Sequence, residues 1–351
     1  MQNSIRQPAD KINEYDVVIV GAGPAGLWAA KTLAKSNLKT LLIEKNQIIG
    51  PKICAGGLTF KDITNGIPKN ILQRKFNEVF IKSPKQYIKI ASDKLLVGTV
   101  NRQDLGQWMK KQITGDNIII IRDQVLNINL KQNELRLKSG QIIKYKYLIG
   151  ADGSNSQVRN ALGLKQNNVA LAYQYKIKKV FPKLEVIINV DRFGPWYIWI
   201  FPHWDHTLIG TGCDPKVFSL KINRREFNKW LKENNIDVSQ AEFQAWKINY
   251  DYQGFQFDNI FLVGDAGGFT SGLTGEGIFA AMTSGKEAAK KIIDPSYNLK
   301  ELNLLLKNKA KHEKIIKEVQ SNSALMKIKI ELVLFFTKFR FISKILIKML
   351  A

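Results

Sequence analysis

Three glycines at a spacing typical of dinucleotide binding follow the first apolar run of this sequence. Gly21, Gly23 and Gly26 come directly after the run that ends at Val20. Such glycines permit a tight turn and let the backbone approach a pyrophosphate, while the next helix offers free N–H groups and its positive dipole to the phosphates. Glu44 stands about 20 residues further on, where an acid accepts hydrogen bonds from ribose hydroxyls. The pattern predicts a site for NAD or FAD.

A cysteine beside paired glycines is the second chemical feature, in the stretch KICAGGL. The chain has 2 cysteines, Cys54 and Cys213, which are too few for a disulfide framework and suit a reducing compartment. Gly56 and Gly57 let the backbone approach a bound ring closely. Cys54 is therefore a core filler, a ligand or a group that faces a reaction, and Cys213 is expected in the core.

Three aromatic side chains share one face of a predicted strand in the stretch YIWIFP. On a strand, Tyr197, Trp199 and Phe201 project to one side, and Ile198 and Ile200 project to the other. This row forms a long apolar wall that suits an unsaturated hydrocarbon chain. The same row also fits an ordinary aromatic core.

The surrounding patterns predict the elements that must position these residues. Continuous apolar runs at 17–20, 40–43 and 147–150 are typical of buried parallel strands, and Pro24 opens a helix. Residues 170–250 mostly alternate between apolar and polar, which is typical of antiparallel sheet. We expect an α/β protein: a Rossmann-like domain, an inserted antiparallel β-sheet domain and a C-terminal helical tail. The expected segments are 14–60, 96–165 and 251–295 for the nucleotide-binding domain, 61–95 and 166–250 for the substrate domain, and 296–351 for the tail.

Further motifs resemble those of the glutathione-reductase-type flavoproteins, in the branch that contains the aromatic hydroxylases. Asp152 in LIGADGSNSQVR and Gly264–Asp265 in FLVGDAGG are similar to the second and third FAD motifs of that branch. Arg102 in NRQDL resembles its flavin-contacting arginine. The resemblance implies that the cofactor is FAD and that Asp265 binds its ribitol chain.

Within that branch the sequence resembles the geranylgeranyl reductase family, flavoproteins that saturate isoprenoid double bonds. KICAGGL resembles the Lys-x-Cys-x-Gly-Gly loop of that family, YIWIFP its Tyr-x-Trp-x-Phe-Pro motif, and LTGEGI its loop that closes over the flavin. The resemblance spans roughly residues 15–290. The chain departs from the family at His203, where lysine is usual, and at Ser271–Gly272, where Asn-Pro is common.

The fingerprint and the resemblance together imply three groups of site residues. Cys54 is the candidate proton donor, because a thiol is mostly protonated at neutral pH and reduced flavin supplies only the hydride. The substrate residues are Gly57, Tyr197, Trp199, Phe201 and Pro202. The FAD residues are Gly21, Gly23, Pro24, Ala25, Gly26, Glu44, Lys45, Cys54, Ala55, Gly56, Arg102, Val125, Asp152, Gly264, Asp265, Gly275, Gly277 and Ile278.

The histidines do not indicate a metal site. His203 and His206 follow Phe-Pro at a predicted turn, and their spacing to Asp205 and Cys213 fits no common zinc pattern. We expect both to be solvated turn residues, with His203 at the pocket mouth.

The charge of the chain is strongly positive, at a formal +23. Residues 300–351 hold 12 Lys and Arg against 4 Glu, and Arg340, Lys344 and Lys348 form a stripe at helical spacing. Such a helix is typical of binding to an anionic membrane surface, although it also fits a terminal helix packed on the FAD domain. The polar N-terminus and the short apolar runs favour a cytoplasmic protein at the inner face of the membrane. No nucleic-acid motif is present, and the sequence does not indicate an oligomeric state.

These observations predict an FAD-dependent reductase that saturates the polyprenyl chain of a lipid, a diphosphate or a quinone. The external electron donor is NAD(P)H or a ferredoxin-like carrier, because the sequence holds no second nucleotide fold. One alternative is an FAD-dependent monooxygenase that hydroxylates an aromatic or prenylated quinone precursor. A second alternative is a flavin-binding membrane protein without turnover.

Overall fold

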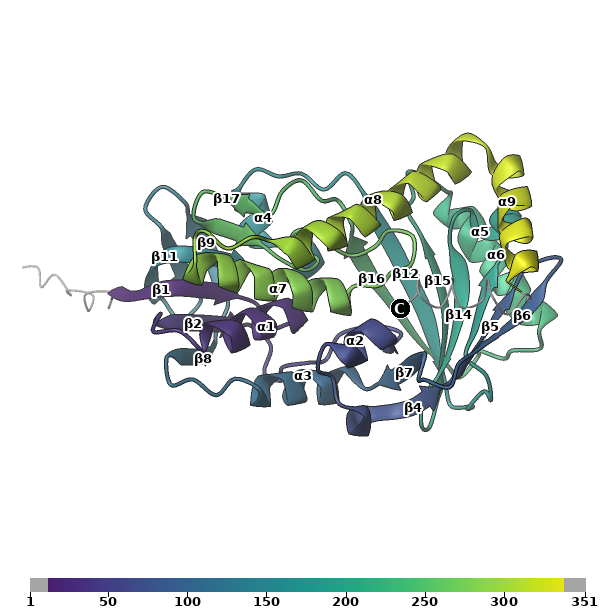
Figure 1. The fold of residues 1–351 in the computed structure, drawn as a ribbon, viewed down its shortest axis with the longest axis horizontal. Coiled ribbons are helices and arrows are strands. Elements are labelled where there is room, and N and C mark those ends of the chain that lie inside the picture. The colour runs from purple at the N-terminus through teal and green to yellow at the C-terminus, as the bar shows by residue number, and fades with distance from the viewer. Residues whose placement is uncertain (1–11, 338–351) are drawn as a thin grey trace, which may run out of the picture.

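The computed structural model describes residues 12–337, whose elements form two lobes bridged by a long helix (Figure 1). The first lobe is built on an eight-stranded sheet with the central order β17–β18–β11–β1–β2–β8. Strand β1 is parallel to both of its neighbours, as the continuous apolar runs predicted. The strands are β1 (Ile12–Val20), β2 (Thr40–Glu44), β8 (Ile118–Arg122), β9 (Val125–Asn129), β10 (Glu134–Leu137), β11 (Ile142–Gly150), β17 (Gln256–Phe257) and β18 (Ile260–Leu262).

Two helices from opposite ends of the chain pack closely beside this sheet. They are α1 (Pro24–Leu33) and α7 (Ile278–Ile293), and their approach requires Gly285. A Cβ on Gly285 would lie 2.1 Å from the carbonyl oxygen of Ala25, so no larger residue fits. The first lobe also contains α3 (Arg102–Lys111), η2 (Gly153–Asn155) and α4 (Gln157–Ala161).

The second lobe is a seven-stranded sheet in the order β16–β12–β15–β14–β13–β5–β6. The sheet is antiparallel as expected, except that β13 pairs in parallel with β5. Strand β5 comes from an earlier part of the chain and joins the edge of β13, which its alternating pattern alone could not reveal. The strands are β5 (Glu78–Lys82), β6 (Tyr87–Ala91), β12 (Val169–Ile177), β13 (Glu185–Ile188), β14 (Tyr197–Pro202), β15 (Thr207–Cys213) and β16 (Glu242–Asn249).

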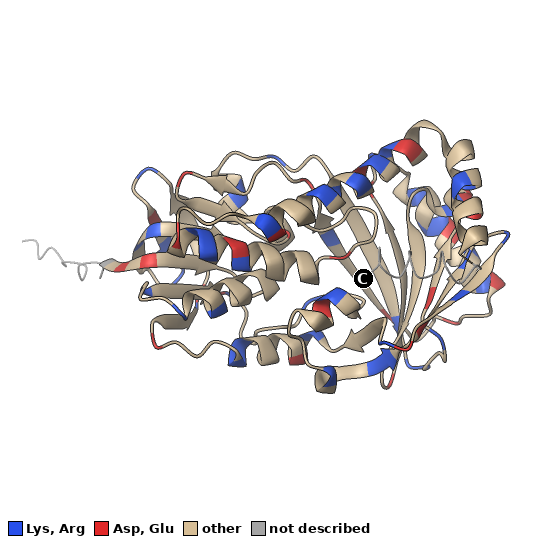
Figure 2. Cartoon of the chain, in the orientation of Figure 1, with Lys and Arg blue, Asp and Glu red and all other residues tan. Residues whose placement is uncertain are grey.

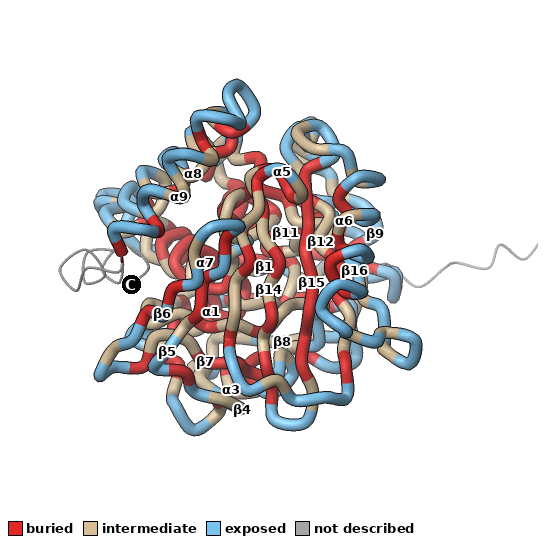
Figure 3. Tube along the Cα trace, turned by 90° about the vertical axis from the view of Figure 1, so that its right-hand side faces the viewer, coloured by how far each residue is buried: buried red, intermediate tan, exposed pale blue. Residues whose placement is uncertain are grey.

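Helix α6 (Leu220–Glu233) covers one face of this sheet. Its residues Phe227 and Trp230 pack against Ile198 and Ile200 of β14, so the odd-numbered residues of β14 point to the other side. Figure 3 shows the buried strands at the centre and the exposed turns of α6, α8 and α9 around them. The short helix α5 (Val190–Phe193) lies beside α6.

A small three-stranded sheet links the lobes on the side of α3 (Figure 1). It contains β3 (Gly57–Thr59), β4 (Leu72–Phe76) and β7 (Val97–Val100), with α2 (Phe60–Thr64) and η1 (Lys69–Ile71) between β3 and β4. Because β3 begins within the cysteine stretch, three residues after Cys54, this sheet fixes where Cys54 lies.

Two C-terminal helices complete the described chain. Helix α8 (Lys300–Ser321) runs from the first lobe to the second and carries several lysines (Figure 2), and α9 (Ser323–Phe336) packs on β5 and β6 through Leu334. The structure thus confirms the expected α/β class with a Rossmann-like lobe, a second sheet and C-terminal helices. Between residues 12 and 337 no helix is long and apolar enough to span a bilayer. The stripe expected at Arg340, Lys344 and Lys348 lies outside the described residues.

Candidate functional site

The turn after β1 has the geometry that the glycine pattern predicted. Gly21 has φ +101°, and a Cβ there would lie 2.5 Å from the carbonyl oxygen of Ala151. A Cβ on Gly26 would lie 2.0 Å from the carbonyl oxygen of Gly21, so helix α1 packs directly on the turn. A Cβ on Gly23 would meet nothing within 4 Å. Gly21 and Gly26 therefore build the turn, while Gly23 leaves open space in front of it.

Glu44 lies at the end of β2, beside this turn. Its Oε2 accepts a hydrogen bond from the Ala22 N–H at 2.7 Å, and its Oε1 accepts from the backbone N–H and side-chain amide of Asn46. The carboxylate thus fixes the strand end to the turn, at the position where the fingerprint expects a ribose. Pro24 and Ala25 form the first turn of α1, and Lys45 is exposed just after Glu44.

Asp265, a predicted cofactor residue, is held by three side chains, two of them from distant parts of the chain. Its carboxylate accepts hydrogen bonds from the Nζ of Lys52 at 2.8 Å, the Oγ of Ser154 at 3.0 Å and the Oγ1 of Thr270 at 2.6 Å. Burial raises the pKa of Asp265, but Lys52 and these hydrogen bonds outweigh burial and hold the pKa below its usual value. Gly277 opens α7 close by, where a Cβ would lie 3.7 Å from Oδ1 of Asp265.

Two further predicted residues present polar atoms without protein partners. Oδ2 of Asp152 accepts from the N–H groups of Gln157 and Val158 at the start of α4, but its buried Oδ1 has no partner among residues 12–337. Burial raises the pKa of the Asp152 carboxyl. Arg102 opens α3, and its buried Nε likewise lacks a partner in the described chain. These atoms and the open space at Gly23 fit a cofactor that carries hydroxyl and phosphate groups, such as FAD.

Not every predicted cofactor residue can use its side chain. Val125 packs in the core with Val18 and Val20 of β1, so only its backbone is able to face a cofactor. Ile278 is buried at the start of α7. Gly264 has φ +57° and donates its N–H to the Oγ of Ser284, which holds the loop after β18 against α7.

The cysteine stretch lies against the aromatic face of β14. Sγ of half-buried Cys54 accepts a hydrogen bond from the Gly56 N–H at 3.4 Å. The carbonyl oxygen of Cys54 accepts from Gln174, whose Oε1 in turn accepts from the Nε1 of Trp199. A Cβ on Gly57 would lie 2.4 Å from the ring of Phe201, so only glycine allows β3 to pass so close to the aromatic row.

Tyr197, Trp199 and Phe201 are all half-buried on one face of β14, whereas Ile198 and Ile200 are buried on the other. The structure therefore places the three aromatics on one side, as predicted. The hydroxyl of Tyr197 donates to the carbonyl oxygen of Thr274 at 2.5 Å, which ties the wall to the loop before α7. Burial raises the pKa of Tyr197, so its hydroxyl stays protonated at neutral pH.

A small apolar cavity of 40 Å³ separates this face from the loop at residues 271–275. Trp196, Leu273 and Gly212 are among the residues that line it, together with Tyr197 and Trp199 of the aromatic row. Pro202 is buried at the strand end, where its carbonyl oxygen accepts from Thr99. A Cβ on Gly275 would lie 4.0 Å from the Tyr197 hydroxyl oxygen, so the glycine loop borders the same space.

The expectation that His203 is a solvated turn residue is wrong. Its side chain is 2% exposed, with Nε2 3.0 Å from the carbonyl oxygen of Ala55 and Nδ1 2.6 Å from Oε1 of Gln73. Burial lowers the pKa of His203 to about 4. Position 203 continues the odd-numbered face of β14, and this alternation could have indicated that the imidazole supports the Ala55–Gly56 backbone.

Several residues of the site were not predicted from the sequence. Lys52 stands in the quoted stretch KICAGGL, yet nothing in the spacing showed that it pairs with Asp265, 213 positions later. Gln174 and Thr59 belong to alternating or short strands, where their partners depend on the tertiary structure. Cys213 is buried in the core, as expected, and burial raises the pKa of its thiol to about 12.

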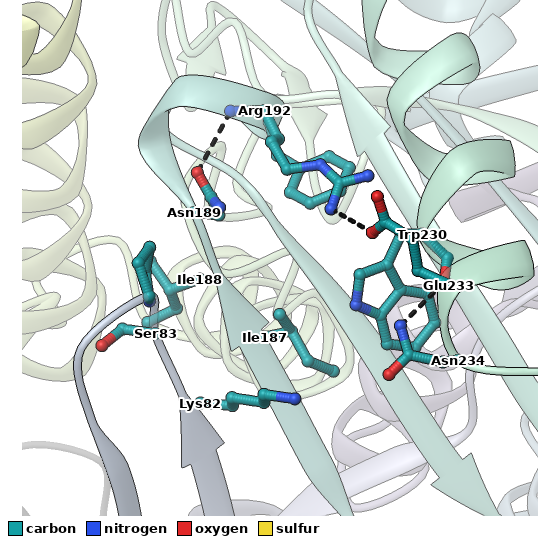
Figure 4. Close-up of a pocket in the computed structure, with 11 residues that line it drawn as sticks. Lys82, Ser83, Ile187, Ile188, Asn189, Arg192, Trp230, Glu233 and Asn234 are labelled. Atoms are coloured by element: carbon teal, nitrogen blue, oxygen red, sulfur yellow. Dashed lines mark hydrogen bonds and ion pairs between the residues drawn. The ribbon is translucent and has the colours of Figure 1, made fainter.

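A larger cavity of 170 Å³ lies on the opposite face of the second sheet (Figure 4). Ile187 and Trp230 line it, and they belong to the core cluster of the α6 side. Arg192, one of its charged residues, is paired with Glu226 at 3.0 Å and with Glu233 at 2.7 Å. The residues that could bind a cofactor and a substrate therefore gather on the other face, between the two lobes.

Comparison with known proteins agrees with this arrangement. A family model described as FAD binding domain matches residues 130–323, and one described as pyridine nucleotide-disulphide oxidoreductase matches residues 15–183. The chain is 29% identical over 303 residues to geranylgeranyl diphosphate reductase of Rhodobacter capsulatus, covering 79% of this chain and 74% of that protein. It is 28% identical over 295 residues to digeranylgeranylglycerophospholipid reductase of Methanocaldococcus jannaschii, covering 77% and 75% of the two chains. A geranylgeranyl bacteriochlorophyll reductase-like protein of Thermoplasma acidophilum has a similar fold, with a TM-score of 0.70, 24% identity and coverage of 88% and 84%.

Proposed function

This chain belongs to the FAD-binding domain family, and from that premise we propose that it is an FAD-dependent reductase of the geranylgeranyl reductase type. The proposed reaction saturates double bonds in a polyprenyl chain carried on a lipid, a diphosphate or a quinone. The observation that carries this proposal is the apolar wall of Tyr197, Trp199 and Phe201, which faces the Cys54 loop next to the FAD elements. The names of the relatives, reductases of geranylgeranyl diphosphate and of a digeranylgeranyl lipid, support reduction over hydroxylation.

The site residues divide between cofactor and substrate. Gly21, Gly23 and Gly26 would receive the pyrophosphate, and Asp265 with Lys52 would meet the ribitol chain. When bound and reduced, FAD supplies a hydride for one carbon of the alkene. The second carbon needs a proton, for which Cys54 is the proposed donor because its sulfur lies on the loop that borders the wall. Phe201 and Trp199 would exclude water and orient the chain.

An anaerobic single-turnover experiment tests this function. FAD-loaded protein is reduced with dithionite and mixed with geranylgeranyl diphosphate or a prenylated lipid extract. Reoxidation of the flavin together with products heavier by two hydrogens per bond supports the reductase. Reoxidation only after oxygen is admitted, with oxygen gained by a prenylated aromatic, supports the monooxygenase instead. The absence of flavin reduction by NADH, NADPH or a reduced ferredoxin-like carrier would favour a protein without turnover.

Membrane binding is a further part of the proposal, because the substrate class resides in lipid. Leu325, Ile328 and Leu332 on α9 are 46%, 58% and 50% exposed, and their spacing places them on one stripe. Met326 and Leu334 on the other side of α9 are buried. In a flotation experiment the protein should rise with phosphatidylglycerol vesicles. The Ile328→Glu variant should stay in the unbound fraction, with its FAD content unchanged. Equal flotation of both proteins would contradict this role for α9.

A further inference from the structure

A single threonine hydroxyl joins two carboxyl groups at the edge of the proposed substrate site. Thr59 ends β3, and its Oγ1 lies 3.1 Å from Oδ2 of Asp62 on α2 and 3.0 Å from Oε1 of Glu276 in the loop before α7. The backbone N–H of Thr59 also donates to Asp62 at 2.8 Å. Two segments separated by more than two hundred residues are therefore connected through one hydroxyl.

The number of protons in this group follows from its hydrogen bonds. A threonine hydroxyl has one proton to donate, and an ionised carboxylate only accepts. Separate hydrogen bonds from Thr59 to both acids therefore require a second proton, held by Asp62 or Glu276, which then donates to the hydroxyl. With both acids ionised, one of the two contacts loses its hydrogen bond and two like charges face each other.

The surroundings of Asp62 favour the protonated pair. Its side chain is 1% exposed, and its Oδ1 has no hydrogen-bond partner in the described chain. Burial and the charge of Glu276 raise the pKa of Asp62 to about 7, against the smaller lowering effects of the Thr59 hydrogen bonds and the charge of Arg102 on α3. Glu276 is only partly buried, Tyr197 from β14 is a neighbouring titratable group, and His312 from α8 bonds to Ser271 of the same loop.

Glu276 belongs to a loop that rests on the aromatic wall. The indole Nε1 of Trp196 donates to the carbonyl oxygen of Gly272 at 2.7 Å, and Tyr197 donates to Thr274. Within the loop, the Ser271 N–H donates to the carbonyl oxygen of Glu276 at 3.1 Å. The loop leads directly into Gly277, beside Asp265, so its position decides how the wall and the cofactor site are closed.

We propose that Asp62 and Glu276 share one proton through Thr59, and that this shared proton latches the loop at residues 271–277 against the substrate wall. Asp62 and Thr59 act as positioning residues in this latch and do not touch the reacting atoms. Loss of the proton at higher pH removes one hydrogen bond, introduces repulsion between the carboxylates and releases the loop. The consequence for catalysis rests on the proposed function, whereas the latch itself does not.

Hydrogen exchange of the FAD-loaded full-length protein tests the latch without substrate. The amides of Ser271 and Gly275, which bond within the loop, are followed between pH 5 and 8 after correction for intrinsic exchange. Protection should fall by up to about tenfold per pH unit between pH 5 and 7, because the carboxyl of a released loop is already ionised there, and should level off above pH 7. Trp196 fluorescence should change over the same range, because its indole bonds to the loop.

Three variants separate the latch from general destabilisation. Asp62→Asn cannot ionise, so the pH-dependent loss of protection should disappear. Thr59→Val removes the bridging hydroxyl and should leave the loop less protected already at pH 5. The matched control, Asp93→Asn, changes an exposed carboxylate and should behave as the wild type.

Two results would overturn the proposal. One is a wild-type loop whose protection is constant from pH 5 to 7, and the other is an Asp62→Asn variant with the same pH-dependent loss as the wild type. If Asp62→Asn does not fold, Glu276→Gln replaces the other, partly exposed acid of the pair. The pH-dependent loss of loop protection should disappear in that variant as well. A pH-dependent loop in a protein that reduces no prenyl chain would refute the proposed function and leave the latch standing.

Discussion

His203 should make this protein sensitive to mild acid. The imidazole is 2% exposed, and its Nε2 bonds to the carbonyl oxygen of Ala55, so the folded state holds it neutral. Its pKa falls from the usual 6.5 to about 4, mainly because of burial. Between these two values the unfolded chain binds a proton that the folded protein does not, so stability decreases as the pH falls. A difference of about 2.5 pKa units corresponds to about 3 kcal/mol.

Urea unfolding followed by tryptophan fluorescence measures this effect at pH 7, 6 and 5. The wild type should lose up to about 1.4 kcal/mol of unfolding free energy per pH unit more than His203→Gln, whose amide does not titrate. His206→Gln is the matched control, because His206 is the adjacent histidine of the same turn and pairs with exposed Asp205. Equal losses of stability in the wild type and His203→Gln would refute the reasoning.

Four other substitutions test the FAD site and the wall. Gly23→Ala should fold normally, since its Cβ meets no protein atom within 4 Å, but should lower FAD affinity at least tenfold in a fluorescence titration; unchanged affinity would place the pyrophosphate elsewhere. Gly26→Ala should instead destabilise the protein by about 1–3 kcal/mol in thermal unfolding, because its Cβ would lie 2.0 Å from the carbonyl oxygen of Gly21. Gly57→Val should displace Phe201 and reduce prenyl turnover while the FAD content stays constant; wild-type turnover would contradict the role of the wall. Lys52→Met should leave Asp265 without its ion pair and weaken FAD binding about tenfold, whereas Lys45→Met, at an exposed position after Glu44, should have a smaller effect.

The local features of this protein could be predicted from its sequence because they depend on short-range rules. The apolar run at 17–20 and the glycines after it specify a buried strand and a tight turn, and the structure has both. The alternation in YIWIFP likewise specifies which residues of β14 share a face. Strand periodicity and the conformational freedom of glycine explain these patterns, and both act between residues that are close in the sequence.

Contacts between distant segments were decided only by the tertiary structure. Lys52 reaches Asp265, and Thr59 reaches Glu276, because the small sheet carries the cysteine stretch to the loop before α7. His203 is buried because the Ala55 backbone covers it, although its sequence neighbours suggested an open turn. The protonation states of Asp62 and His203 depend on burial and on partners far away in the chain, so no local pattern contains them.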